Sequence, residues 1–456
     1  MNERQAVRDY IDGNRQRFQD ELFEFLRIPS VSARSESKED TRRAAEWLAD
    51  KMQRAGLEVS IHDTKGHPIV LGEWRQAGAG APTVLIYGHY DVQPAEPLEL
   101  WSSPPFEPSI RDGRIYARGS VDDKGQLYLH VKSLEAHLAV HGKLPVNVVV
   151  IAEGEEEVGS ENLMPFVREH RDRLACDAIV ISDTTMVGPG MPTIGASLRG
   201  LAYMEIHVQG PAQDLHSGTY GGAVLNPATA LARIIASFHD DNERITIDGF
   251  YDDVDPAETF RANMKRVPHD PAEFLKETGS PMAWGEKDYS TVERTWVRPT
   301  CEVNGLLSGY TGEGAKTVLP SRAMAKVSCR LVPDQDPKKV ARLFEAHVKK
   351  VAPKGVSVTV QELHGGRPWR AKLAGRLVDA GAKALQSAWG KDVVYAGEGG
   401  SIPIVPEFEE VLGAPAILLG FGLPGENAHA PDEWMSVDNY EKGTKAMAEL
   451  LFELAG

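Results

Sequence analysis

The chain has 456 residues, too many for one typical domain, so two or three domains are expected. Its 50 basic and 66 acidic residues give a net charge of −16, which disfavours nucleic acid and anionic membranes as partners, because both bind basic surfaces. With 42% apolar residues, a polar start and no apolar run of transmembrane length, the composition favours a soluble globular protein.

The first stretch of the chain predicts helices followed by short strands. Apolar residues recur at helical spacing over 18–26 and 47–52, and Gly56 is a suitable helix end. A further helical face runs over 127–138 and ends near Gly142. Short apolar runs predict strands at 57–63, 68–74, 82–88, 146–153 and 177–183. The last two runs are nearly continuous in apolar residues, which is typical of strands buried on both faces of a parallel sheet.

The pattern changes near residue 193, where apolar and polar residues begin to alternate as in a half-exposed antiparallel sheet. Strands of this kind are predicted at 201–210, 323–333 and 356–363, and helices at 226–238 and 340–351. The segment from about 240 to 300 has weak periodicity and is expected to be irregular. After about residue 369 the earlier pattern returns, with a helix over 377–385, a strand at 415–421 and a closing helix over 440–454.

These elements predict an α/β fold with a mostly parallel central sheet and helices on both of its faces. Residues 1–192 and 369–456 would form this domain, and residues 193–368 would form a separate α+β domain inserted into it. The odd number and wide spacing of Cys176, Cys301 and Cys329 predict buried free thiols and a cytoplasmic location.

Several predicted strands run directly into side chains of the kinds that bind metals. Their ends carry His89 and Asp91, Glu156 and Glu157, Asp183, and His429. The acidic pair Asp122-Asp123 adds a fifth position, at the start of a predicted helix. Ligands of open α/β sheets bind at the carboxyl ends of the strands, so these side chains are expected to meet. Two histidines and several carboxylates suit a divalent cation such as zinc, or a pair of them.

Each position also has a simpler interpretation when it is taken alone. His89 and Asp91 could belong to a turn, and Asp122-Asp123 could cap the helix that follows. The acidic run 153–157 could be a solvated loop, although it would crowd negative charge at the end of a buried strand. Two neighbouring glutamates could instead divide the work between metal ligation and general base catalysis. All five positions together favour a metal site over five unrelated features.

The motifs that carry these residues resemble a known family. GHYDVQP, RGSVDDKG, EGEEEVGS, ISD, DLHSG, SCRLVP, EGGSIP and ENAHAPDE occur in the order found in the M20 metallopeptidases. The resemblance runs from about residue 20 to the end and is closest to the carnosine and cytosolic nonspecific dipeptidase branch. It implies a zinc-peptidase catalytic domain and an inserted lid domain that also forms a homodimer interface.

The resemblance also implies a role for each residue of the site. His89 and Asp183 would bind one zinc ion, Glu157 and His429 the other, and Asp122 would bridge both. The Asp122-Asp123 peptide bond would be cis, at a position where family members often have asparagine after the first aspartate. Asp91 would orient His89, and Glu156 would be the general base for a water between the metals, which could also be Mn²⁺ or Co²⁺.

The lid would supply the remaining groups. His216 would reach the active site of the partner subunit and stabilise the oxyanion, while Arg330, Gly400 and Ser401 would bind the free carboxylate of a small peptide substrate. The expected activity is hydrolysis of dipeptides or short peptides with a free C-terminal carboxylate. Two alternatives remain: an N-acyl amino acid deacylase with the same centre, and a noncatalytic metal-binding protein with the same fold.

Overall fold

A computed structural model of the chain describes residues 2–255, 261, 264–265, 267 and 269–456. Contacts divide the chain into two compact units, of which the first comprises residues 1–196, 371–396 and 407–456. The second comprises residues 197–370 together with 397–406. The predicted bounds differ from these units at three places: residues 193–196 group with the first unit, and residues 369–370 and 397–406 group with the second.

The first unit is built around a large sheet, whose strands run in the order β1-β2-β6-β3-β7-β17-β8, with β16 also beside β8. A further strand of this sheet, β15, consists of residues of the second unit. The bounds are β1 Glu58–His62, β2 Ile69–Trp74, β3 Thr83–His89, β6 Asn147–Glu153, β7 Ala178–Ile181, β8 Thr193–Leu198, β15 Trp369–Arg370, β16 Val394–Glu398 and β17 Ala416–Leu418. The central strands β6, β3, β7 and β17 are parallel, and antiparallel pairs flank them. The predicted α/β class with a parallel centre is confirmed.

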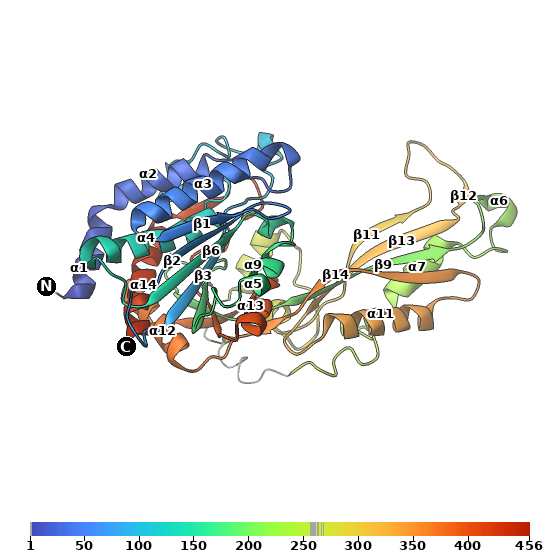
Figure 1. The fold of residues 1–456 in the computed structure, drawn as a ribbon. Coiled ribbons are helices and arrows are strands. Elements are labelled where there is room, and N and C mark those ends of the chain that lie inside the picture. The colour runs from blue at the N-terminus through green and yellow to red at the C-terminus, as the bar shows by residue number, and fades with distance from the viewer. Residues whose placement is uncertain (1, 256–260, 262–263, 266, 268) are drawn as a thin grey trace. The chain divides into compact units, whose positions relative to one another are not determined.

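Helices cover both faces of this sheet because its central strands are apolar on both sides. On β3, Val84 and Ile86 join a core with several helices, whereas the Tyr87 ring meets Phe408 at 5.4 Å on the opposite face. Figure 1 shows α2, α3 and α4 lying along the sheet. The helices of this unit are α1 Glu3–Gly13, α2 Arg15–Leu26, α3 Lys38–Ala55, α4 Lys124–His141, α5 Leu163–Glu169, α12 Arg376–Trp389 and α14 Val437–Ala455, together with α13 Ile404–Leu412 from Glu407 onward. Gly56 and Gly142 end α3 and α4 in left-handed conformation, as predicted.

A smaller sheet of the first unit joins β4 (Ser109–Arg111), β5 (Arg114–Tyr116) and β18 (Trp434–Ser436). Short 3₁₀ turns lie at Ser35–Ser37, Leu98–Leu100 and Glu156–Val158. The β5–β18 pairing is relevant to the site, because it brings the segment after His429 beside the segment that leads to Asp122.

The second unit is a four-stranded antiparallel sheet, ordered β11-β13-β9-β14, with helices on one face (Figure 1). Buried and partly exposed residues alternate along β9 (Gly200–Gln209) and β13 (Arg322–Leu331), as predicted. The buried side packs against α7 (Pro227–Ala236) and α11 (Pro337–Val351). The other elements are β10 Leu215–His216, α6 Ser217–Tyr220, α9 Pro271–Thr278, α10 Thr291–Trp296, β11 Glu302–Ser308, β12 Val318–Leu319 and β14 Ser357–Gly366.

The prediction of irregular structure from 240 to 300 is wrong for α9 and α10, and part of that segment lies outside the described residues. Asp270 caps α9 with Pro271 at its first position, and Ser290 and Glu293 form a capping box at α10. These local signals, rather than periodicity, would have predicted both short helices. Of the helices that the structure describes, none has the length and apolar character needed to cross a membrane.

Candidate metal centre

The carboxyl ends of the parallel strands carry the predicted site residues. His89 is the last residue of β3, and Asp183 follows β7 by two residues. Glu156 and Glu157 lie in the 3₁₀ turn after β6, and His429 lies in the loop after β17. Because these strands are parallel neighbours, their ends meet at one edge of the sheet.

Two overlapping groups of ligand atoms form at this edge. His89, Asp122 and Asp183 make one group, and Asp122, Glu157 and His429 make the other, each with its atoms within 4.8 Å of one another. The His89 Nε2 atom lies 3.1 Å from Asp122 Oδ1 and 3.9 Å from Asp183 Oδ2. The His429 Nε2 atom lies 2.8 Å from Asp122 Oδ2 and 3.3 Å from Glu157 Oε2. The two Asp122 oxygens therefore face different groups.

The donor set fits divalent cations. His89 has no exposed surface, and its Nε2 atom has no hydrogen-bond partner although it faces two carboxylates. A buried nitrogen among carboxylate oxygens calls for positive charge between them, which either a bound cation or a proton on the imidazole supplies. Imidazole nitrogen and carboxylate oxygen are ordinary zinc ligands, and they also serve other divalent metals.

The pKa shifts of these side chains also indicate an excess of negative charge at this edge of the sheet. Burial raises the pKa of the Glu156 carboxyl to about 7, and the carboxylates of Glu157 and Asp122 add to this rise. The same two carboxylates raise the pKa of His429 to about 10. Burial, followed by the charge of Asp123, raises the pKa of Asp183 well above its ordinary range. Bound cations would let the carboxylates stay ionised and the imidazoles stay neutral.

Asp91 contacts both the histidine and the glutamate pair. The His89 Nδ1 atom lies 3.1 Å from the Asp91 carbonyl oxygen and 3.4 Å from its Oδ1 atom. The Asp91 carboxylate also accepts the backbone N–H groups of Glu156, at 3.3 Å, and Glu157, at 3.1 Å. It thus links two strand ends, whereas the sequence suggested only a contact with His89.

The Asp122-Asp123 peptide bond is cis, as the family resemblance implied. Asp123 is buried, and its Oδ2 atom accepts the backbone N–H of His89 at 3.1 Å. The side-chain amide oxygen of an asparagine at this position could accept the same hydrogen bond from His89, so aspartate and asparagine are interchangeable for this contact. Glu156 belongs to neither ligand group, whereas its neighbour Glu157 belongs to one.

Two residues without a predicted role form hydrogen bonds to the candidate metal ligands. Gln93 donates from Nε2 to Glu157 Oε2 at 2.8 Å, and its backbone N–H donates to Oε1 at 3.1 Å. Glu433 accepts the backbone N–H of Asp122 at 3.2 Å and forms a buried ion pair with Arg118 at 2.6 Å. Both lie in quoted motifs, GHYDVQP and ENAHAPDE, but only the folded chain shows which partners they reach.

The second unit brings together Arg330 and Ser401, which are predicted to bind the substrate carboxylate. The Arg330 Nη1 atom donates to Ser401 Oγ at 2.9 Å, and the Gly400 carbonyl oxygen accepts the backbone N–H of Arg199 at 3.1 Å. His216 lies at the end of β10 with an exposed side chain, and its Nδ1 atom accepts the Gly218 N–H at 3.0 Å.

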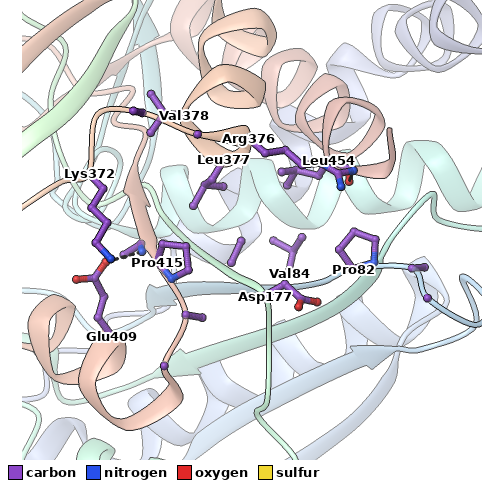
Figure 2. Close-up of a pocket in the computed structure, with 18 residues that line it drawn as sticks. Pro82, Val84, Asp177, Lys372, Arg376, Leu377, Val378, Glu409, Pro415 and Leu454 are labelled. Carbon is purple, nitrogen blue, oxygen red and sulfur yellow. Dashed lines mark hydrogen bonds between the residues drawn. The ribbon is translucent and has the colours of Figure 1, made fainter.

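A pocket of about 790 Å³ lies at the other end of the parallel strands and contains none of the predicted site residues. Figure 2 shows Pro82, Val84, Asp177 and Pro415 lining it, near the amino ends of β3, β7 and β17. Asp177 accepts the Thr83 N–H at 2.7 Å and so fixes the start of β3. The presence of Asp177 in this pocket therefore has a structural explanation.

A parallel sheet with two histidines and several carboxylates at its carboxyl edge, one aspartate being shared by two groups, defines the class of metal-dependent hydrolases. The chain belongs to peptidase family M20/M25/M40, whose model matches residues 85–453. It is thus a metallopeptidase, and the resemblance found in the motifs is confirmed.

Relatives cover nearly the whole chain. The Cys-Gly metallodipeptidase dug1 of Schizosaccharomyces pombe is 33% identical over 98% of this chain and 97% of its own length. The Beta-Ala-His dipeptidase of Homo sapiens is 29% identical over 99% of this chain and 92% of its own length. The solved structure of the di-peptidase Dug1p from Saccharomyces cerevisiae has a TM-score of 0.85 at 29% identity, covering 100% of this chain and 99% of that one.

Proposed function

We propose that this enzyme is a dipeptidase that holds two divalent cations, zinc being the expected metal, and cleaves dipeptides with a free C-terminal carboxylate. The observation that carries the proposal is the position of Asp122, whose two carboxylate oxygens face separate histidine–carboxylate groups. His89 and Asp183 would hold one cation, and Glu157 and His429 the other. The names of the relatives, Cys-Gly and Beta-Ala-His dipeptidases, support the substrate class.

When bound, the cations would acidify a water molecule and polarise the peptide carbonyl. Glu156 would accept the proton of that water and pass it to the leaving amine. Its carboxyl is suited to this exchange because burial raises its pKa to about 7, although bound cations would lower that value. Asp91 would keep His89 and the Glu156 backbone in register through the hydrogen bonds described above.

The second unit would bind the substrate. Arg330 and Ser401 would bind the C-terminal carboxylate, with the Gly400 backbone beside them. The enzyme would form a homodimer through this unit, and the exposed His216 of one subunit would stabilise the oxyanion in the site of the other. A cytoplasmic location also remains a prediction.

A panel of substrates tests the proposal. The metal-free enzyme should be inactive, and Zn²⁺, Mn²⁺ or Co²⁺ should restore hydrolysis of Cys-Gly or Beta-Ala-His. N-acetyl amino acids serve as the comparison, since an N-acyl amino acid deacylase would use the same centre. Faster turnover of the N-acetyl substrates than of every dipeptide would replace the proposal with that alternative.

The Glu156→Gln variant tests the assignment of the base. Because glutamine cannot accept the proton, turnover should fall by about 10²- to 10⁴-fold while the number of metal ions per chain stays unchanged. Metal content measured by atomic emission, beside activity, separates the roles. Loss of metal from this variant would make Glu156 a ligand instead of the base.

A further inference from the structure

Two arginines of the second unit converge on one short turn, Gly399–Ser401. Arg199 donates from Nε to the Gly399 carbonyl oxygen at 3.0 Å, and its backbone N–H donates to Gly400. Arg330 donates to the Ser401 hydroxyl at 2.9 Å. Arg199 precedes β9, and Arg330 lies opposite Leu201 near the end of β13, so adjacent strands bring the two guanidinium groups to the same turn.

Neither guanidinium has an ion pair with another residue in the described part of the chain. The same unit shows the usual arrangement at Arg298, whose buried guanidinium donates twice to Glu286, at 2.6 and 2.7 Å. Arg199 and Arg330 are half-buried, and a guanidinium that is partly shielded from water without a counter-charge is unfavourable; placing two together adds repulsion. Arg199 and Arg330 therefore form a cationic site without an anion from the protein.

The charge on these side chains persists at neutral pH. Burial, followed by the neighbouring charge of Arg330, lowers the pKa of Arg199 to about 10, and Glu302 on β11 opposes this shift more weakly. Burial also lowers the pKa of Arg330. Both groups still carry their protons near pH 7, so the turn presents two positive charges to a ligand.

The turn also leaves space beside the Arg199 head group. A Cβ atom at Gly399 would lie 3.3 Å from Arg199 Nη2, closer than most such contacts, and glycine avoids this crowding. The Nε atom of Arg199 is occupied by the Gly399 carbonyl, which leaves the terminal nitrogens as donors. A guanidinium fixed at Nε in this way is preorganised to bind a carboxylate.

We infer that Arg199 is a second arginine for the terminal carboxylate of the substrate and acts together with Arg330. The inference rests on the proposed function and extends it: the enzyme would select acids over the corresponding amides through two cationic side chains. The ligand class is a main-chain carboxylate, the group shared by dipeptides and N-acyl amino acids. Arg199 would then be a determinant of specificity as well as a brace for the turn.

The experiment compares a dipeptide with its C-terminal amide, using the metal-loaded enzyme and the variants Arg199→Gln and Arg199→Lys. Losing one charged hydrogen-bonding group should raise KM for the acid by about 10- to 100-fold, with a much smaller change for the amide. Lysine keeps the charge and loses the planar fork, so the Arg199→Lys variant should have an intermediate KM. Thermal melting of each variant shows whether it is folded.

Arg322→Gln is the matched control, because it removes a positive charge from an exposed position on the same strand as Arg330, and it should leave both KM values unchanged. If Arg199→Gln raises KM by the same factor for the acid and the amide, or changes neither KM, its discrimination between them is unchanged. Either result would show that Arg199 only supports the turn, and it would overturn the inference. Failure of the proposed function is distinguishable, since the wild-type enzyme would then hydrolyse neither compound.

Discussion

Glu433 has no exposed surface, and both of its carboxylate oxygens accept hydrogen bonds from the segment that leads to Asp122. The Oε1 atom accepts the N–H groups of Val121, at 3.0 Å, and Asp122, at 3.2 Å. The Oε2 atom accepts the Gly119 N–H at 3.0 Å and the Arg118 guanidinium at 2.6 Å. Since Glu433 follows His429 in the same loop, its hydrogen bonds connect the loop of His429 to the segment of Asp122.

The Glu433→Gln variant should therefore bind metal more weakly without losing any ligand. The amide would present N–H groups to N–H donors and leave the Arg118 charge buried without its partner. Loss of such a supporting contact should lower metal affinity by about 10- to 100-fold, measured by titrating the metal-free protein with Zn²⁺.

Glu107→Gln provides the control for Glu433→Gln, because Glu107 is an exposed carboxylate paired with Arg27 at 2.7 Å. This variant should bind metal like the wild type. If Glu433→Gln lowers only the melting temperature and leaves metal affinity unchanged, the residue stabilises the fold without positioning Asp122.

At the scale of elements, the start of α4 explains the second glycine of the RGSVDDKG motif, Gly125. Alanine normally stabilises a helix relative to glycine, but a Cβ atom at Gly125 would lie 1.9 Å from the Ser120 carbonyl oxygen. The helix thus begins against the segment that carries Asp122. Gly125→Ala should destabilise the protein by about 1–3 kcal/mol or more and weaken metal binding, as measured by urea unfolding and metal titration.

Gly13→Ala is the comparison for this substitution. Gly13 is the last residue of α1, and a Cβ atom there would have no neighbour within 4 Å. This variant should be neutral or stabilising, by up to about 1 kcal/mol. Equal behaviour of the two variants would contradict the close approach at Gly125.

Helix α4 also carries a buried histidine that should make the fold sensitive to acid. Burial lowers the pKa of His137 to about 4, although its Nε2 atom lies 2.8 Å from the Ala448 carbonyl oxygen. In the unfolded chain the His137 imidazole binds a proton below its ordinary pKa of about 6.5. In the folded chain it stays neutral down to about pH 4. Stability therefore falls as the pH drops through this window.

The His137→Gln variant should lose this part of the pH dependence. Between pH 7 and 5 the free energy of unfolding of the metal-free wild type should fall by about 2 kcal/mol more than that of the variant. Urea unfolding at the two pH values measures the difference. Parallel curves for both proteins would show that His137 does not contribute.

At the scale of the whole molecule, the sequence predicts best what depends on short range and on strand order. His89, Asp183 and the glutamate pair follow apolar runs directly, and parallel pairing of those runs brings their ends together. Helix ends at Gly56 and Gly142 are equally local, because a left-handed residue suits glycine. The meeting of these side chains at one edge of the sheet could thus be predicted from sequence, while their role as metal ligands stays a prediction.

The remaining features depend on contacts between distant segments, which periodicity does not encode. Arg199 meets Gly399 across 200 residues, and Glu433 meets Asp122 across 311. Hydrophobic periodicity does not predict short helices such as α10, because they have too few turns to show a repeat. Motif resemblance supplied Arg330 and Ser401, but their hydrogen bond is visible only in the fold.

The proposed homodimer has a candidate surface on β11, which is an edge strand of the second unit. Leu306 and Leu307 are 63% and 57% exposed there, and an apolar edge strand is a ready surface for a second copy. The double variant Leu306→Glu and Leu307→Glu should dissociate the dimer, because two-fold symmetry would bring the new charges of both copies together.

Sedimentation equilibrium measures the change, and the pair Leu98→Glu and Leu100→Glu, on exposed leucines of the first unit, is the control. Because His216 is proposed to act in the partner's site, turnover should fall with the dimer. A fully active monomer would contradict that role, and an unchanged dimer would place the interface elsewhere.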